Sequence, residues 1–350
     1  MNMPPSLAWL VDEASHTATP ELFLGELGRM LLAEGIPVAR MALTLAVPHP
    51  IIAQRTWLWR AAGNEVIEAL GFGVSAQAGR EWLAEIGNAR EGLASEASGV
   101  RFLGWAGSQP FSAEQQALID DAARFAKAPL AAISARLAGA ALLEAYLGRR
   151  SAARVGAGAL KRGSGETIRA ALLCADLRDF TAMSESAPAE TVIAALDAWF
   201  ERVTGAVNVF GGEVLKFIGD GVLAIFPVAG TAHDACAAAI RAANAAKAGM
   251  KYLNATREGD GLPSLPFGMA LHFGEIFWGN IGAADRLDFT AIGPAVNLVS
   301  RLEGLCKPLG QTVLVSGALA SEVPEGLVDL GSHALRGIAE PCPVFALGGE

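Results

Sequence analysis

Two aspartates stand where apolar β-strands are expected to end. Asp176 closes the segment ALLCAD, and Asp220 is the central residue of the Gly-Asp-Gly turn in GGEVLKFIGDGVLAIF (211–226). Either residue alone is typical of an ordinary turn or helix cap. If the strand ending at Asp176 lies beside the 211–226 hairpin, both carboxylates reach the same end of one sheet. Close carboxylates repel each other unless a cation lies between them, and rigid oxygen ligands suit Mg²⁺ or Mn²⁺.

Cationic and amide side chains recur in the same half of the chain. Lys216 lies inside the first strand of the hairpin, where an unpaired buried charge is costly, so it needs a partner. Asn297 and Arg301 are four residues apart and share one face of the helix that Pro294 opens. A solvated surface pair is the ordinary interpretation, but the apolar residues around them predict a packed helix. Arginine suits a charged phosphoryl group, and Arg336 is a further cation near a predicted strand end.

Strands and helices alternate from residue 167 onward, which predicts an α/β or α+β domain with a central sheet that begins βαβ. The amphipathic segment 188–210 and the Ala-rich segment 232–250 are the expected helices flanking the hairpin. Further strands are expected at 167–177, 265–282, 311–317 and 342–347, and the segment 286–305 reads as a strand, a Gly-Pro turn and a helix.

The first part of the chain predicts a small α+β domain. Thr19-Pro20 can cap and start a helix, and strands are expected at 38–47, 55–61 and 100–107. The stretch 63–99 between them has no clear pattern.

A capping-box pattern at Ser112 and Gln115 opens a long helical stretch that runs to about residue 148, with a kink expected at Pro129. A polar, Gly-rich segment (161–166) then marks a boundary. Such a helix is suited to dimer contacts and signal passage between domains; packing on its own domain is the equally open alternative.

Composition excludes several classes of protein. The chain has 350 residues, a net charge of −9 and no basic run, which argues against nucleic-acid binding. The first residues lack a charged segment followed by an apolar one, so no signal peptide is expected. No apolar run approaches the ~20 residues that span a bilayer, so we expect no transmembrane segment. Four cysteines without CxxC spacing indicate buried thiols and a cytoplasmic protein.

Three motifs together resemble the catalytic domain of class III nucleotidyl cyclases: LLCADLRDFTAMSE, GGEVLKFIGDGVLAIF and DFTAIGPAVNLVSRLE, in this order and spacing. The resemblance covers residues 167–350 and implies an α+β domain with a ferredoxin-like βαββαβ core. The segment before it resembles the connector of some bacterial adenylate cyclases, so 111–166 is expected to be a connecting helix and linker. Residues 1–110 weakly resemble a GAF-type sensor and are expected to form a regulatory domain.

The resemblance assigns roles residue by residue. Asp176 and Asp220 match the metal-binding aspartates of a site for two Mg²⁺ or Mn²⁺ ions, and the carbonyl of Leu177 is an expected further ligand. Lys216 matches the lysine that reads adenine, where guanylate cyclases typically carry Glu. Asp179 departs from the family, which usually has Gly there, and puts an extra carboxylate near the expected metal site. The other matches are Thr290 at the second base-reading position, where a bacterial subgroup has Thr; Asn297 and Arg301 for the ribose and the transition state; and Arg336 for the triphosphate.

The resemblance implies a homodimeric adenylate cyclase that converts ATP to 3′,5′-cyclic AMP and pyrophosphate, for signal transduction. In this family two catalytic domains pair head to tail, so that Asp220 and Lys216 would serve different sites. An unknown ligand would regulate the N-terminal region. The alternatives are a guanylate cyclase, which Lys216 disfavours, and a catalytically weak or dead cyclase-like module for dimerisation or nucleotide binding, which should have lost the residues found here.

Overall fold

A computed structural model describes residues 3–48, 52–71, 77–95 and 99–348. The chain divides into two compact units, Met1–Tyr146 and Leu147–Glu350. The functional division into 1–110, 111–166 and 167–350 stays a prediction.

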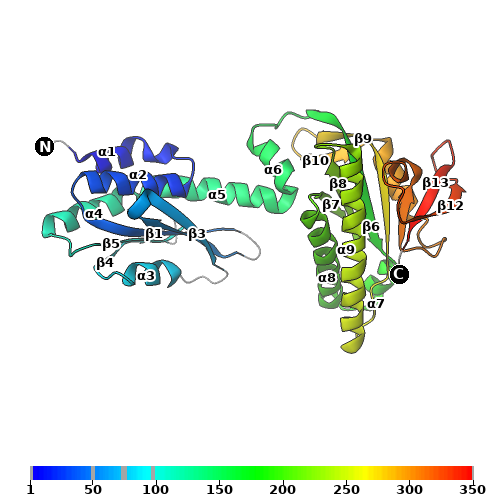
Figure 1. The fold of residues 1–350 in the computed structure, drawn as a ribbon, viewed down its shortest axis with the longest axis horizontal. Coiled ribbons are helices and arrows are strands. Elements are labelled where there is room, and N and C mark those ends of the chain that lie inside the picture. The colour runs from blue at the N-terminus through cyan, green and yellow to red at the C-terminus, as the bar shows by residue number, and fades with distance from the viewer. Residues whose placement is uncertain (1–2, 49–51, 72–76, 96–98, 349–350) are drawn as a thin grey trace. The chain divides into compact units, whose positions relative to one another are not determined.

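The first unit is built on a five-stranded antiparallel sheet (Figure 1). The predicted helix and three predicted strands are confirmed, and the Thr19 side chain caps its helix by accepting from the Leu22 amide. The unpatterned stretch 63–99 contains two edge strands and a helix. The likeness to a GAF-type domain stays a prediction. In sheet order the strands are β3 (Glu65–Gly71), β2 (Gln54–Arg60), β1 (Val38–Ala46), β5 (Val100–Gly107) and β4 (Ala89–Ser95), and the helices are α1 (Pro5–Asp12), α2 (Pro20–Ala33), α3 (Gln77–Ala84) and α4 (Ala113–Phe125).

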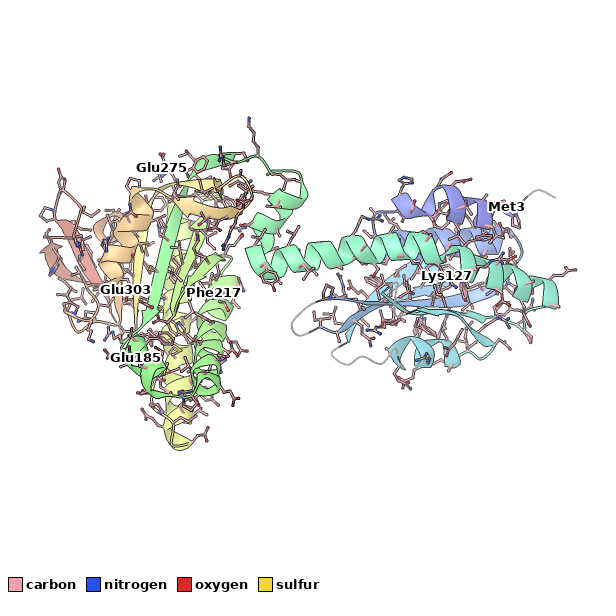
Figure 2. All side chains as sticks on the ribbon, turned by 180° about the vertical axis from the view of Figure 1, so that it is seen from behind. Met3, Lys127, Glu185, Phe217, Glu275 and Glu303 are labelled. Atoms are coloured by element: carbon pink, nitrogen blue, oxygen red, sulfur yellow. The ribbon has the colours of Figure 1, made fainter. Side chains whose placement is uncertain are left out.

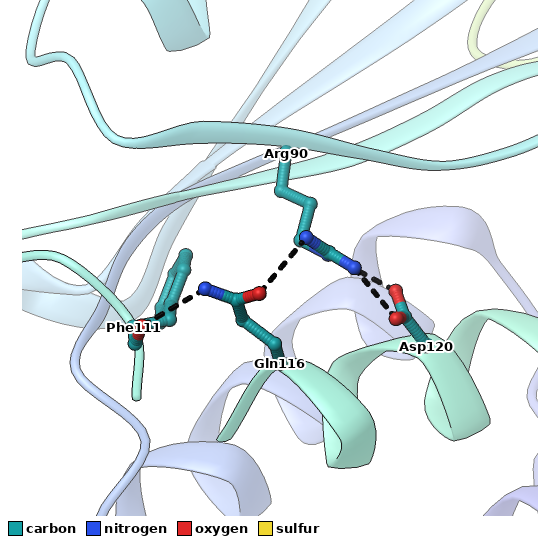
Figure 3. Close-up of polar contacts among 4 residues, drawn as sticks. All are labelled: Arg90, Phe111, Gln116 and Asp120. Atoms are coloured by element: carbon teal, nitrogen blue, oxygen red, sulfur yellow. Dashed lines mark hydrogen bonds and ion pairs between the residues drawn. The ribbon is translucent and has the colours of Figure 1, made fainter. Parts of the chain in front are cut away.

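Helix α4 packs on the first unit. Both hydrogen bonds of the Ser112–Gln115 capping box are present, and Arg90 of β4 forms two hydrogen bonds with the Asp120 carboxylate, at 3.0 and 2.6 Å (Figure 3). The helix ends at Phe125, four residues before Pro129. Proline lacks the amide hydrogen that would bond to that carbonyl and its ring clashes with it, which gives the predicted kink its physical cause.

Helix α5 (Lys127–Leu147) follows at once, and the buried side chains of Leu130 and Ile133 in its first turns join the core of the first unit. By length and composition alone α5 could cross a membrane, so the expected absence of such a segment is not supported. Many residues of α5 are alanine or glycine, so its large apolar residues do not form a continuous run, and a search for apolar runs in the sequence does not find it. One such helix is weak evidence for a membrane span, because core helices of soluble proteins pass the same test.

The second unit contains the predicted ferredoxin-like core. Its strands run in the order β9-β6-β8-β7, with antiparallel neighbours, which is the order expected of a βαββαβ chain. Two long helices, α8 and α9, lie along one face of this sheet (Figure 1). The elements are β6 (Gly165–Leu177), α8 (Ala189–Val209), β7 (Glu213–Ile218), β8 (Gly221–Pro227), α9 (Ala232–Gly259) and β9 (Phe267–Gly282).

The remaining elements surround this core. β10 (Leu287–Ile292) pairs with β9, and α10 (Pro294–Glu303) packs on the sheet face opposite α8 and α9. Beyond β9 the sheet continues through β11 (Val313–Ser316), β13 (Cys342–Leu347) and β12 (Leu327–His333), so β7 and β12 are its two edges. The sequence had predicted β10, α10, β11 and β13; it missed β12 and the short helices α6 (Arg149–Gly156), α7 (Phe180–Ser186) and α11 (Gly317–Ala320).

Candidate active site

Strand order brings the two candidate metal aspartates together. Asp176 is the penultimate residue of β6, and Asp220 lies in the turn between β7 and β8. β6 and β8 are neighbours, with Ala175 opposite Val222. The Leu177 amide donates a hydrogen bond of 3.2 Å to Asp220 Oδ2. The sequence prediction that both carboxylates reach the same end of one sheet therefore agrees with the strand arrangement.

The electrostatics of this pair favour a bound cation. Burial raises the pKa of Asp176 to about 7, with further upward contributions from the hydrogen bond and charge of Asp220 and from the charge of Glu303. Asp176 Oδ1 is buried and has no hydrogen-bond partner among the described residues. No group of three or more His, Cys, Asp or Glu side chains in the described ranges could hold a metal by itself. The pair thus fits a divalent ion that takes its other ligands from water and substrate.

The candidate base-reading residues lie on two further strands, and Lys216 has a partner that sequence reasoning missed. Lys216 of β7 forms an ion pair with Asp288 of β10. Thr290 is two residues further along β10, so alternation places it on the same side of the strand as Asp288. Thr290 is 5% exposed, and its Oγ1 is a buried atom without a hydrogen-bond partner in the described part of the chain. Strand alternation was the signal that could have identified Asp288.

Helix α10 presents Asn297 and Arg301 on its exposed side. Its buried residues, among them Val299 and Leu302, pack on the sheet, so the predicted packed helix is present. Neither polar side chain forms a hydrogen bond or ion pair with the residues that the structure describes. The structure therefore does not join this pair to Asp176 and Asp220.

Arg336 is exposed on the loop between β12 and β13. Those strands are at the opposite end of the sheet from β7. Within the described ranges its side chain has no polar contact, so the structure does not bring it to the other candidates.

Two charged residues near the aspartates, Glu303 and Arg178, were not assigned from the sequence. Glu303 is the last residue of α10 (Figure 2). Its side chain lies close to Gly268, the β9 residue opposite Asp176, because a Cβ atom added to Gly268 would lie 2.4 Å from Glu303 Oε1. Burial raises the pKa of Glu303, the positive charge of Arg178 lowers it, and the negative charge of Asp220 raises it. The Arg178 guanidinium also donates to the Gln311 carbonyl. Both residues lie inside motifs quoted above, Arg178 in LLCADLRDF and Glu303 in VNLVSRLE, and this position could have identified them.

Asp179, the departure from the family motif, is an exposed residue whose Oδ1 accepts a hydrogen bond of 2.7 Å from Lys307. Its backbone has φ 59° and ψ 23°, in the left-handed region. Glycine adopts that region without steric cost, and aspartate tolerates it. The extra carboxylate is thus engaged by a surface lysine.

Comparison with known proteins places this domain in a family. Residues 164–322 match the model of the adenylate and guanylate cyclase catalytic domain. Adenylate cyclase 1 of Rhizobium meliloti (strain 1021) is 37% identical over 180 residues, 50% of this chain and 26% of that protein. The adenylate cyclase of Anabaena cylindrica is 32% identical over 158 residues, 44% of this chain and 30% of that protein. The chain therefore spans roughly a quarter to a third of the length of these relatives.

A solved structure of a bacterial light-regulated adenylyl cyclase is similar in fold, with a TM-score of 0.52 and 25% identity, covering 59% of this chain and 60% of that one. The fold and the motif matches together define a nucleotidyl cyclase domain. Residues 164–322 of this chain belong to the class III nucleotidyl cyclase family.

Proposed function

We propose that this protein is an adenylate cyclase that converts ATP into 3′,5′-cyclic AMP and pyrophosphate. The observation that carries the proposal is the Asp176–Asp220 pair, in which one buried carboxylate oxygen of Asp176 lacks a partner among the described residues. A cation there would satisfy that oxygen and remove the repulsion between the carboxylates.

Asp176, Asp220 and the carbonyl of Leu177 would hold two Mg²⁺ or Mn²⁺ ions. When bound, such ions lower the pKa of the attacking ribose 3′-hydroxyl and neutralise charge on the phosphates. The protein's own contribution is to fix Asp220: the Leu177 amide donates to its carboxylate from the side of β6, and Trp199 Nε1 donates a 2.8 Å hydrogen bond to its backbone carbonyl.

The side chains of Lys216 and Thr290 favour adenine over guanine as the base of the substrate nucleotide. A lysine can donate to the unprotonated N1 of adenine, whereas the protonated N1 of guanine needs an acceptor. The buried Thr290 hydroxyl has unused hydrogen-bonding capacity on the strand that also pairs with Lys216 through Asp288. Asp288 would hold the lysine in place when no nucleotide is bound.

A homodimer would complete the site. Asn297 and Arg301 are exposed without polar partners among the described residues, as expected of side chains that act on a nucleotide held by a second copy. Arg336, also exposed, would bind the triphosphate. Apolar side chains are exposed on the edge strand β7 and on β10 beside it: Phe217 at 52% (Figure 2), Ile218 at 63% and Ile292 at 45%. We place the protein in the cytoplasm, and the N-terminal unit would regulate it in response to a ligand that is not identified.

The direct test is incubation of the purified chain with ATP or GTP and Mg²⁺ or Mn²⁺, followed by chromatographic separation of the cyclic products. We expect cyclic AMP from ATP only, and none when EDTA replaces the metal. Cyclic GMP as the main product would make the chain a guanylate cyclase. Nucleotide binding without any cyclic product would indicate a dead cyclase-like module.

A further inference from the structure

A buried glutamate at the start of the hairpin has no role in the proposed chemistry. Glu213 is the first residue of β7 and is 4% exposed. Its Oε1 accepts hydrogen bonds from the backbone amide and the hydroxyl of Ser151, at 2.9 and 2.8 Å. Its Oε2 accepts one from the Arg150 amide at 3.2 Å. Glu213 therefore caps the first turn of α6 from a strand 62 residues away.

The fit between α6 and the hairpin is close. Gly148 precedes α6 with φ 80°, and a Cβ atom added there would lie 3.1 Å from Glu213 Oε1 and 3.2 Å from the Val214 carbonyl. The Arg150 guanidinium donates to the Gly211 carbonyl at 3.2 Å. The chain that leaves α5 is thus fixed to the base of the hairpin within its first three residues.

The same segment also holds the strand next to β10. The Arg154 guanidinium lies 4.7 Å from the ring centroid of Trp278 on β9, and this ring meets Phe289 of β10 edge to face at 5.4 Å. Asn280, 3% exposed on β9, donates to the Ala159 carbonyl. The segment from α6 to the start of β6 therefore contacts both β7 and the β9–β10 pair, whose strands carry Lys216 and Thr290.

A bulge lies between Glu213 and Lys216. Val214 is opposite Ala224 and Lys216 is opposite Leu223, so one extra residue enters β7 at this point. Bulges turn the side chains that follow them and are placed where a strand must aim a residue. The direction in which Lys216 leaves the strand thus depends on how the start of β7 is held.

We propose that Glu213 is a positioning residue: by fixing α6 to the base of the hairpin it sets Lys216 relative to Thr290, and a displacement of α6 changes which nucleotide base the site accepts. This inference rests on the proposed role of Lys216 in base reading. Only Gly148 separates α5 from α6, so a change in the connecting helix reaches the hairpin through this contact first.

The test compares Glu213→Gln, Glu213→Ala and Ser151→Ala with the control Asp234→Asn. Asp234 accepts a hydrogen bond in the capping box of α9, so its variant replaces a carboxylate acceptor by an amide in a helix cap away from α6. Hydrogen exchange of the α6 amides in the full chain should be about tenfold or more faster in the Glu213 variants, and less affected in Ser151→Ala. KM for ATP should rise more than kcat falls, and the preference for ATP over GTP should drop. The control should keep wild-type α6 exchange and base preference.

Two results would overturn the proposal. Unchanged exchange in α6 would show that Glu213 does not hold the helix, and faster exchange with wild-type KM and base preference would show that the contact is only structural. If Glu213→Ala does not fold, Ser151→Ala still removes one of the three hydrogen bonds. Affinities for ATP and GTP measured by calorimetry report the base preference without turnover. An inactive wild-type chain would therefore refute the proposed function, and the effect of Glu213 on base preference could still be measured.

Discussion

Asp176→Asn tests whether an ionised Asp176 carboxylate, partly buried and close to Asp220 and Glu303, destabilises the fold when no cation is bound. The pKa of Asp176 is raised from an ordinary 3.8 to about 7 by burial, by Asp220 and by Glu303. Because the folded-state pKa is the higher one, the folded chain binds this proton more tightly than the unfolded chain does. The resulting penalty is absent below the unfolded-state pKa and grows as pH rises through the interval to about 7.

The size of the penalty follows from the shift. At about 1.4 kcal/mol per pKa unit, three units correspond to about 4 kcal/mol. Asp176 is only half-buried, so solvent screening reduces this value, and we expect about 1–2 kcal/mol. For a domain as large as the second unit, Leu147–Glu350, a free-energy difference of about 1–2 kcal/mol corresponds to a difference in Tm of about 2–8 °C.

Scanning calorimetry of the full chain can measure this difference. In EDTA at pH 8, Asp176→Asn should unfold at a higher temperature than wild type, and the difference should shrink toward pH 5. Added Mg²⁺ should stabilise wild type and not the variant, because binding to the folded state shifts Tm. Asp179→Asn is the control, since its exposed carboxylate pairs with Lys307 and should contribute little at either pH. An Asp176→Asn protein no more stable than wild type at pH 8 in EDTA would refute the destabilising effect of the ionised Asp176 carboxylate.

Three further predictions concern activity. Asp176→Ala or Asp220→Ala should abolish cyclic AMP formation with the fold intact by circular dichroism; near wild-type turnover in either would contradict the metal assignment. Lys216→Glu should sharply reduce ATP turnover, since specificity built on buried hydrogen bonds is large, while GTP turnover by the wild type would show that Lys216 is wrongly assigned. Asp220→Ala and Arg301→Ala should each be nearly inactive, yet mixing them should restore about a quarter of wild-type activity, because half of the dimers are mixed and each has one intact site. Mixed dimers that form and stay inactive would place both residues in one subunit's site.

The sequence predicted those elements that bury many apolar residues. β6 and β8 contain continuous buried runs, α8 buries one face, and both predicted helix caps, at Thr19 and Ser112, accept the expected hydrogen bonds. β3 and β12 were missed because both are edge strands without a buried residue. A strand that buries so little has no apolar alternation to reveal it.

Backbone conformation accounts for another feature that the sequence could only flag. Asp179 differs from the glycine typical of the family motif, and side-chain chemistry alone suggested an effect on the metal site. The structure puts the residue at φ 59°, where glycine is favoured for its backbone freedom. What distinguishes the position is thus conformation, and the carboxylate is held on the surface by Lys307.

The hairpin shows most clearly where sequence reasoning ends. It carries three charges, Glu213, Lys216 and Asp220, and physical chemistry requires a partner for each. The partners come from three different elements: Ser151 of α6 at a separation of 62 residues, Asp288 of β10 at 72, and the Leu177 amide of β6 at 43. No local pattern encodes pairs that far apart. Because one short hairpin contacts α6, β10 and β6, a shift at its base can reach both the residues proposed to read the base and those proposed to bind the metal, without any contact to the nucleotide.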